Sequence, residues 1–230
     1  LRGIAREAYH LGQLTAEDYE RIKGLKPARG ERLPAGRSAS RGELAALLLA
    51  CAADLGPAGV RDGALLALLY AGGLRRAEAA ALDLADYDPG EGAVRVRGKG
   101  NKERRVYLTG GVTAALTDWL ATRGPAPGPL FRPVNKARRV VPRRLSAQAI
   151  YAILQKRAGE VGLAHLSPHD LRRTFVGDLL DAGADLSTVQ GMAGHANIAT
   201  TARYDRRGDV ARKRAAGLLH VPYVRHRGAR

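Results

Sequence analysis

The chain contains very little cysteine and few aromatic side chains. Cys51 is the one cysteine in 230 residues, and Phe, Trp and Tyr together make up only 5% of the sequence. A single cysteine excludes a disulfide framework within the chain, which is consistent with a reducing cytoplasm. Its apolar neighbours at residues 47–52 predict that Cys51 is a small buried core residue.

Long apolar runs are also missing. The longest, residues 64–71, has the length of a core helix and is too short to span a bilayer. No signal peptide and no internal repeat are visible. We therefore expect a cytoplasmic protein with no membrane partner. Because the sequence opens on Leu inside a helical pattern, we expect it to be part of something longer.

Positive charge is abundant. The chain has 38 Lys and Arg against 22 Asp and Glu, which gives a net charge of +16 and a pI near 10.7. Such a field attracts polyanions, and nucleic acid is the leading candidate. Arginine greatly outnumbers lysine, and a guanidinium can bind a phosphate through two parallel hydrogen bonds.

The pattern along the chain predicts two parts. Residues 1–25 predict two short helices, and residues 26–41 have the proline, glycine and basic residues of an extended cationic linker. We therefore assign residues 1–39 to the end of a helical domain with its linker, and residues 40–230 to the main domain. A capping-box pattern, Ser40 followed by Glu43, marks where the main domain begins.

The main domain is predicted to be mainly α with a small three-stranded antiparallel β-sheet. Val94 and Val96 alternate with arginines, residues 98–101 predict a turn, and a second strand follows at residues 103–108. A short strand near residues 86–87 would complete the sheet. Helices are predicted over residues 40–54, 58–71, 74–84, 111–122, 146–161, 167–183, 186–192, 197–204 and 210–219.

Near the C-terminal end, a few residues suited to phosphoryl transfer fall close together in this basic chain. They are His169, Arg172, His195 and Tyr204. A phenol has a pKa near 10, so Tyr204 needs a partner that takes its proton or stabilises its anion before it can attack a phosphodiester. The histidines and the arginine can move protons and bind phosphate oxygens. A phosphodiester could thus be cut without a metal, and we expect no cofactor.

With two further residues, this set resembles the tyrosine recombinase (phage integrase) family, close to its Xer-like branch. The resemblance covers about residues 40–219 and includes all six motif residues in the family's order: Arg75, Lys99, His169, Arg172, His195 and Tyr204. There are two departures. Arg173 stands where a histidine is common, and residues 191–193 stand where bulky apolar residues are more frequent.

The resemblance implies the catalytic-domain fold of DNA breaking-rejoining enzymes and site-specific DNA cleavage through a 3′-phosphotyrosyl intermediate. The residue chemistry suggests a role for each group. Arg75 and Arg172 would clamp the phosphate, His195 would donate to it, His169 would act as general base, and Lys99 would protonate the leaving 5′-oxygen. Further DNA contacts are expected at Lys102, Arg104, Arg143, Arg144, Arg173 and Arg203.

The family also implies assembly. Its members work on double-stranded DNA as homo-tetramers that hold two duplexes, and they pass a C-terminal segment into a neighbouring protomer. We expect this protein to assemble in the same way on DNA at the nucleoid. A monomeric state of the free fragment is the alternative. Leu218, Leu219 and Val221 are apolar residues near the chain end that could serve as the exchanged segment.

Two other functions compete with this interpretation. A type IB topoisomerase would use nearly the same residues to relax DNA, and a non-catalytic DNA-binding module would keep the charge without the chemistry. Tyr223 is an alternative phenol, but no paired histidine lies beside it. A zinc pair of His165 and His169 is disfavoured, because the predicted helix starts between them and no third ligand is near.

Overall fold

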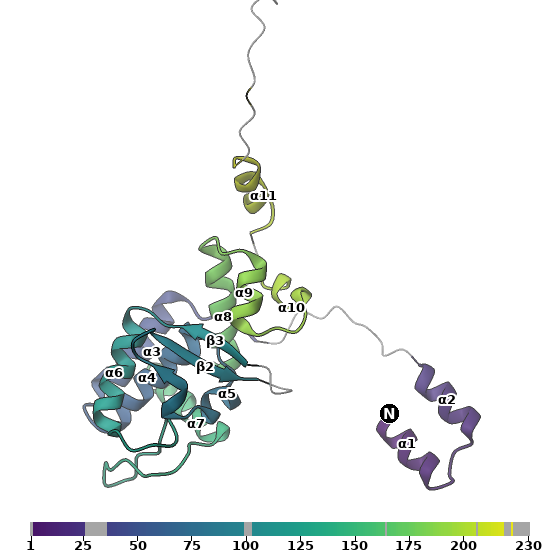
Figure 1. The fold of residues 1–230 in the computed structure, drawn as a ribbon, viewed down its shortest axis with the longest axis horizontal. Helices are drawn as coiled ribbons and strands as arrows, with labels where there is room; N and C mark the ends of the chain where they lie inside the picture. The colour runs from purple at the N-terminus through teal and green to yellow at the C-terminus, as the bar shows by residue number, and fades with distance from the viewer. Residues whose placement is uncertain are drawn as a thin grey trace, which may run out of the picture. The chain divides into compact units, whose positions relative to one another are not determined.

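The chain separates into two compact units in the computed structural model, which describes residues 2–25, 36–98, 103–163, 165–205, 207–218 and 222. The units are Leu1–Ala35 and Gly36–Arg230. Figure 1 shows both. The division falls slightly before Ser40, so residues 36–39 belong to the larger unit rather than to the predicted linker.

The smaller unit contains the two predicted helices, α1 (Arg2–His10) and α2 (Ala16–Gly24). Thr15 caps α2, because its hydroxyl oxygen accepts the backbone N–H of Asp18 at 3.1 Å. The two helices are joined by stacked rings of Tyr9 and Tyr19, whose centroids lie 4.9 Å apart. A short helical pair is thus held by one cap and one aromatic contact.

The larger unit is mainly helical with a small sheet, as predicted. Its first half contains α3 (Arg41–Ala53), α4 (Pro57–Ala71), α5 (Arg76–Ala81), a 3-10 turn (Leu84–Asp86), β1 (Tyr87–Asp88), β2 (Ala93–Arg97) and β3 (Glu103–Tyr107). Its second half contains α6 (Gly111–Arg123), α7 (Ala147–Glu160), α8 (Pro168–Asp181), α9 (Leu186–Ala193), α10 (Ile198–Ala202) and α11 (Gly208–Ala216).

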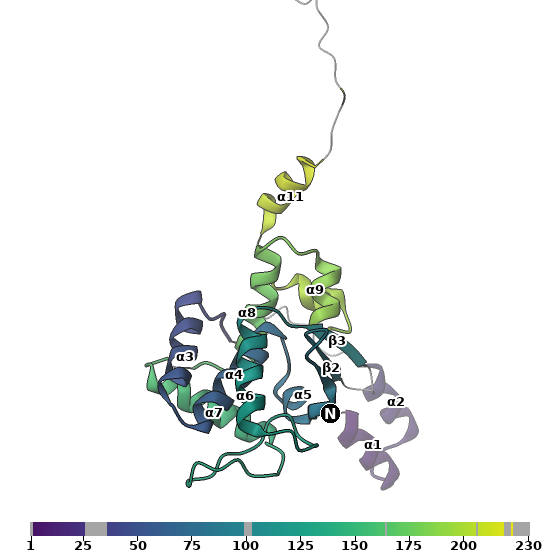
Figure 2. The ribbon, with the colours of Figure 1, turned by 60° about the vertical axis from the view of Figure 1, so that its left-hand side comes forward.

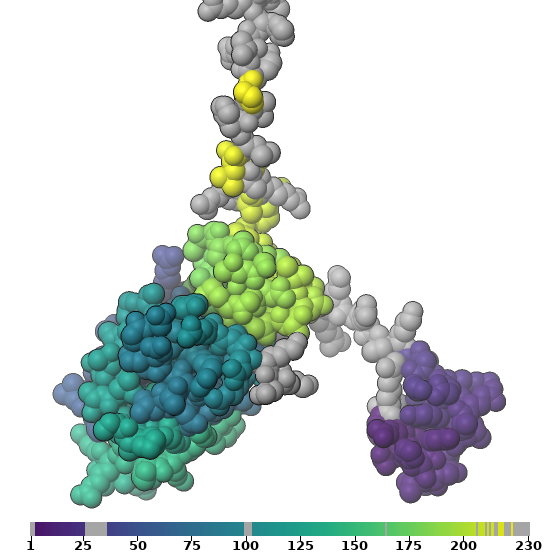
Figure 3. All heavy atoms as spheres, viewed as in Figure 1, coloured from purple at the N-terminus to yellow at the C-terminus, as the bar shows by residue number. Residues whose placement is uncertain are grey.

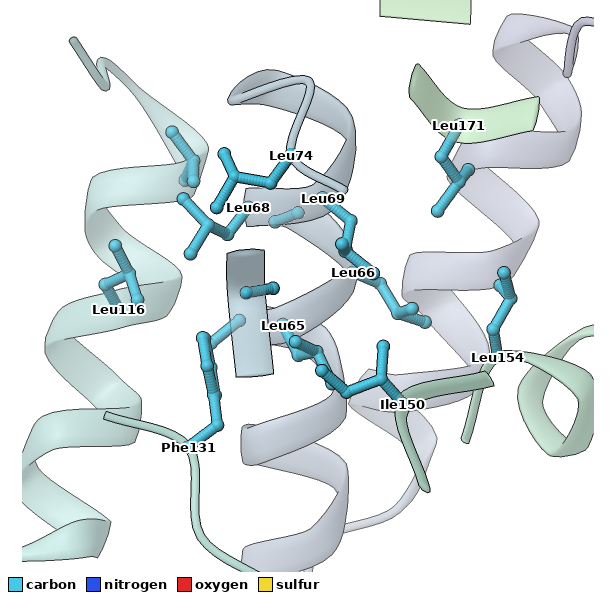
Figure 4. Close-up of a cluster of buried hydrophobic side chains, with 14 of the residues drawn as sticks. Leu65, Leu66, Leu68, Leu69, Leu74, Leu116, Phe131, Ile150, Leu154 and Leu171 are labelled. Atoms are coloured by element: carbon cyan, nitrogen blue, oxygen red, sulfur yellow. The ribbon is translucent and has the colours of Figure 1, made fainter. Parts of the chain in front are cut away.

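Helix α4 is the centre of the hydrophobic core. It packs against α3, α6, α7 and α8, which explains why residues 64–71 are apolar on every side of the helix. Leu65, Leu66, Leu68 and Leu69 are at most 1% exposed, and Figure 4 shows their side chains among those of the surrounding helices. Each such leucine stabilises the fold by about 2 kcal/mol of transfer free energy.

The sheet has the order β1-β2-β3 and is antiparallel throughout. Val94 pairs with Val106, and both are fully buried on the core face. Arg95 and Arg97 point to the other face, where both form ion pairs with the buried carboxylate of Asp86. The alternation of valine and arginine therefore predicted the strand correctly. Figure 2 shows β3 beside α9.

The C-terminal helices differ from the prediction in their ends. Asn197 caps α10 rather than opening it, and the helix ends at Ala202, so Tyr204 lies beyond it. Helix α11 begins at Gly208 and ends at Ala216, short of the predicted Leu219, which lies outside the described residues. Within the described ranges, no helix has both the length and the apolar character needed to cross a membrane.

Candidate active site

Arg75 is the N-cap residue of α5, and its guanidinium joins two distant segments. Its Nη1 donates to Glu78 Oε1 at 2.7 Å, and its Nη2 donates to the carbonyl of Gly194 at 3.2 Å. The backbone N–H of Arg75 donates to Glu78 Oε2 at 2.9 Å, which fixes the start of the helix. The side chain remains 47% exposed and can face a ligand.

Glu78 is a site residue that sequence reasoning missed. Its side chain is only 5% exposed, although it lies three residues from Arg75 on a short surface helix. It also accepts two hydrogen bonds from Arg104 on β3, at 3.1 and 2.8 Å. Burial favours a higher pKa for Glu78, but the hydrogen bonds from Arg104 and Arg75 outweigh it and hold the pKa at about 2. The carboxylate is therefore a permanent anion that orders two arginines.

Arg172 lies on α8 and is 3% exposed. Its Nη1 donates to the carbonyl of Gly73 at 2.6 Å. Its Nη2 is buried and has no hydrogen-bond partner in the described part of the chain. Burial, and then the positive charge of Arg75, lower the pKa of Arg172 to about 10. It remains cationic at neutral pH, with one donor available for an anion.

Gly73 places that carbonyl where Arg172 needs it. Its φ is +56°, a left-handed conformation that other residues rarely adopt. A Cβ atom at this position would also collide with the ring of Phe175 on α8. The turn after α4 can therefore pack against α8 only with glycine at this position.

His169 lies in the first turn of α8, which a capping box of Ser167 and Asp170 opens. The residue is exposed. Even so, the protein packed around its imidazole and the positive charges of Arg173 and Arg172 lower its pKa. A neutral imidazole at physiological pH can accept a proton, as a general base must.

His195 follows α9 and is oriented by a buried hydroxyl. Its Nδ1 lies 2.9 Å from Oγ1 of Thr201, which is fully buried. When the ring proton is on Nε2, Thr201 donates to Nδ1 and Nε2–H is left to donate to a phosphate oxygen. Burial, and then the charges of Arg172 and Arg75, lower the pKa of His195 to about 4. The ring is therefore neutral at pH 7.

This shift predicts a pH-dependent stability. An unfolded imidazole titrates at 6.5 and His195 at about 4, so the unfolded chain binds the proton first as the pH falls. The contribution of His195 to the free energy of unfolding is intact above about pH 6.5. It declines toward pH 4 by roughly 2 kcal/mol after allowance for partial exposure. We expect His195→Gln to lose less stability on acidification in urea unfolding. His165→Gln, at an exposed position, should follow the parent. Equal slopes for parent and His195→Gln would contradict the assignment.

Tyr204 lies close to both His195 and α8. Its ring centroid is 6.3 Å from that of His195, and the guanidinium carbon of Arg173 lies 5.5 Å from the Tyr204 centroid. The ring also packs on the small cluster formed by Phe175, Val176, Leu180, Val189 and Ala193. The Tyr204 ring thus lies beside His195, the histidine expected to donate to the phosphate.

Two cavities meet at Arg75. The first, about 280 Å³, is lined by Arg75, Arg76, Tyr151, Ser167, Pro168, His169 and Arg172. The second, about 860 Å³, lies between β3 and the turn after α9, and Arg75, Arg104 and His195 are among its lining residues. Figure 3 shows the yellow-green residues of the C-terminal helices lying directly against the teal residues of the sheet. Segments far apart in sequence thus form one basic, hollowed surface.

The residues singled out from the sequence fall into three groups. Arg75, His169, Arg172, His195 and Tyr204 come together in the structure, around or beside the two cavities that meet at Arg75. Lys99, the candidate acid, and Lys102 lie outside the described residues. The remaining five are the predicted DNA contacts Arg104, Arg143, Arg144, Arg173 and Arg203.

Those five arginines have very different surroundings. Arg143 and Arg203 are exposed and stay predicted DNA contacts. Arg144 forms an ion pair with Asp83. Arg104 and Arg173 are largely covered by protein, because each is bonded to other segments of the chain. Among the described residues, no group of three or more His, Cys, Asp or Glu is arranged to hold a metal ion.

The sequence profile described as "Phage integrase family" matches residues 40–209. The chain belongs to the phage integrase family. Among curated family members, it is 39% identical over 185 residues to the tyrosine recombinase XerC of Actinobacillus pleuropneumoniae serotype 7, covering 79% of this chain and 58% of that protein. It is 43% identical over 148 residues to XerC of Corynebacterium glutamicum, covering 63% and 46%. The chain thus spans about half the length of these relatives.

Solved structures of the family share the fold. The XerA recombinase superimposes with a TM-score of 0.63 at 27% identity, covering 86% of this chain and 68% of that one. XerH in a post-cleavage complex with its difH substrate gives a TM-score of 0.64 at 24% identity, covering 85% and 56%. The larger unit therefore has the catalytic-domain fold of tyrosine recombinases.

Proposed function

We propose that the chain carries the catalytic domain of a tyrosine-type site-specific recombinase, which cleaves and rejoins double-stranded DNA. The observation that carries the proposal is the convergence of Arg75, His169, Arg172 and His195 around a basic hollow, with Tyr204 stacked beside His195. We assign residues 36–230 to that domain, four residues earlier than the boundary expected from the sequence at residue 40. Residues 1–35 would be the end of an N-terminal DNA-binding domain and its linker.

The scissile phosphate is placed between the two guanidiniums. The buried Nη2 of Arg172 and the exposed guanidinium of Arg75 would bind its non-bridging oxygens, and Nε2–H of His195 would donate to one of them. These groups are held in place before the ligand arrives, so little reorganisation is needed as charge builds up in the transition state. Glu78 neutralises part of the repulsion between the arginines.

The chemical step then balances with these side chains. The phenol oxygen of Tyr204 attacks phosphorus and its proton passes to His169. The bond from phosphorus to the 5′-oxygen breaks, and Lys99 supplies the proton for that oxygen. The products are a 3′-phosphotyrosyl ester and a free 5′-hydroxyl. Attack by a 5′-hydroxyl on this ester reverses the step, so rejoining needs no ATP.

The acid role of Lys99 can be tested with a modified substrate. Lys99→Ala should lower cleavage of ordinary DNA by about 100-fold or more. A 5′-bridging phosphorothiolate has a leaving group that needs no proton, so the same variant should regain most of its rate on that substrate. Lys156→Ala, on α7, is the control and should cleave both substrates normally. Equal loss on both substrates would remove the acid role from Lys99.

The competing functions predict different products. A recombinase exchanges strands between two copies of its target site. The target site can be identified by selecting bound sequences from randomised duplexes. A type IB topoisomerase would instead relax supercoiled plasmids that lack any such site. A binding module would give no covalent adduct with nicked DNA. Relaxation without exchange, or binding without an adduct, would replace the proposal with the corresponding alternative.

For assembly we propose a homo-tetramer on two duplexes, acting at the nucleoid. Its support is the similarity to XerH, which was solved in complex with its difH substrate, and an apolar hollow of about 640 Å³ between α3, α4 and α6. That hollow is large enough to receive an apolar segment. Leu218, beyond the end of α11, is 81% exposed and does not pack on its own core.

Deletion of residues 209–230 tests this assembly. If the segment docks into a neighbour, the truncated chain should form fewer multimers on DNA in native gels and should show an altered cleavage rate. Its melting temperature should stay close to that of the parent, because the described part of α11 contributes no residue to the hydrophobic clusters. Normal assembly, or loss of the fold, would contradict the exchange.

A further inference from the structure

The backbone of residues 36–39 is bound to α8 by three hydrogen bonds. The N–H of Arg37 donates to Asp170 Oδ1 at 2.9 Å, and the N–H of Ala39 donates to Thr174 Oγ1 at 2.8 Å. In return, Nη1 of Arg173 donates to the carbonyl of Gly36 at 2.8 Å. The segment just after the boundary between the units is therefore attached to the helix that carries His169 and Arg172.

Gly36 allows this segment to lie close to α8. Its φ is +109°, and a Cβ atom there would collide with Asp170 Oδ1. The same Cβ would come within 3.6 Å of the Arg173 guanidinium. Any other L-residue would thus be strained at position 36 and would push the segment away from α8.

Arg173 links this segment to Tyr204. The residue is 7% exposed, with one guanidinium nitrogen on Gly36 and the guanidinium carbon 5.5 Å from the Tyr204 ring centroid. A cation over an aromatic face is attracted by the ring's negative potential, more strongly when both are partly shielded from water. One side chain therefore connects the start of the larger unit with its candidate nucleophile.

The ring of Tyr204 needs such a partner. Tyr204 follows the last turn of α10, where its N–H bonds to the carbonyl of Thr201 at 2.9 Å. That bond fixes the backbone, while the orientation of the ring depends on its contacts with His195, the small cluster and Arg173. In-line attack requires the phenol oxygen to be held close to phosphorus, and small displacements of a reacting group cost rate steeply.

We propose that Arg173 is a positioning residue for Tyr204, and that the backbone of residues 36–39 holds Arg173 in place. The inference rests on the proposed function, because it gives Tyr204 the role of nucleophile. It replaces the DNA contact predicted for Arg173 with a contact inside the protein. Movement of residues 36–39 away from α8 would release the guanidinium and lower the fraction of chains ready to cleave.

The test compares two substitutions at different ends of the link. Arg173→Met removes the cation, and Gly36→Ala moves the segment that holds it. Gly162→Ala is the matched control, since Gly162 also has a positive φ of +68° but open space around it. Arg173→Lys keeps the charge and should recover part of the rate. For each variant, covalent adduct formation on nicked DNA is measured at saturating DNA, together with the half-saturating DNA concentration and the melting temperature.

We expect Arg173→Met and Gly36→Ala each to slow adduct formation at saturating DNA by about tenfold, with the half-saturating concentration within about twofold of the parent. The double variant should be no slower than the worse single variant, because both substitutions break one link. Gly162→Ala should react at the parent's rate. If Arg173→Met does not fold, the rate of adduct formation by Gly36→Ala alone tests the inference.

Three results would overturn the inference: unchanged rates in both variants, fully additive losses in the double variant, or a loss confined to DNA affinity. A loss confined to DNA affinity would indicate that Arg173 contacts a DNA phosphate. Failure of the proposed function is distinguishable, because the parent chain would then form no covalent adduct, or would form one that survives Tyr204→Phe.

Discussion

Tyr204→Phe should abolish the covalent protein–DNA adduct on a nicked substrate while leaving DNA binding almost unchanged. The substitution removes one oxygen, the proposed nucleophile, and keeps the ring that packs near His195 and on the small hydrophobic cluster. No second group in the proposed mechanism can form the phosphotyrosyl ester, so the loss should reach the detection limit. Adduct formation is measured by denaturing gel electrophoresis and binding by a salt-dependent mobility shift.

Tyr151→Phe is the matched control. Tyr151 lines the cavity that contains His169 and Arg172, so its phenol is also near the proposed phosphate. The control removes the same oxygen atom from a neighbouring ring, and the adduct should persist. An adduct that survives Tyr204→Phe, or peptide mapping that places the phosphate on Tyr151 or Tyr223, would show that the nucleophile is assigned wrongly.

Arg172→Lys should lower the rate of adduct formation by roughly 100-fold or more, as expected when a preorganised donor to the transition state is lost. A lysine keeps a positive charge, but it cannot bind the Gly73 carbonyl and a phosphate in the planar geometry of a guanidinium. The predicted loss therefore tests the buried Nη2 of Arg172, which lacks a partner in the described chain. Single-turnover cleavage at saturating DNA measures it.

Binding of a small anion separates this role from a folding defect. Inorganic phosphate or vanadate should raise the melting temperature of the parent, since ligands that bind only the folded state stabilise it. The same anion should raise the melting temperature of Arg172→Lys much less. Arg139→Lys, at an exposed site with no proposed role, should behave like the parent in both measurements. A variant with normal anion stabilisation and normal cleavage would exclude Arg172 from the phosphate site.

Sequence reasoning reached the fold because local signals agreed with tertiary packing. The apolar run in α4, the Ser40 and Ser167 caps and the valine–arginine alternation in β2 each require only neighbours a few residues away. Helix ends were less accurate at α10 and α11. At α10, Thr201 inside the helix is bonded to His195, which precedes it, and spacing alone does not reveal such a contact.

The site was predicted less completely, for a physical reason. Six motif residues were proposed because their types and order carry the chemistry. Glu78 and Arg104 were not recognised as partners, because they are 26 residues apart and meet only when β3 packs beside α5. Arg173 looked like a phosphate contact since charge is visible in a sequence and burial is not. Its bond to Gly36 spans 137 residues.

Gly73 has a consequence for efforts to make this chain more stable. Replacing glycine by alanine commonly stabilises a protein by about 0.4–1 kcal/mol, because the unfolded chain loses freedom. At Gly73 the same change would meet a left-handed backbone and the Phe175 ring, and would rotate the carbonyl that binds Arg172. A library selected for heat resistance alone could accept compensating substitutions at Phe175. It would then yield thermostable variants that bind DNA and no longer cleave it.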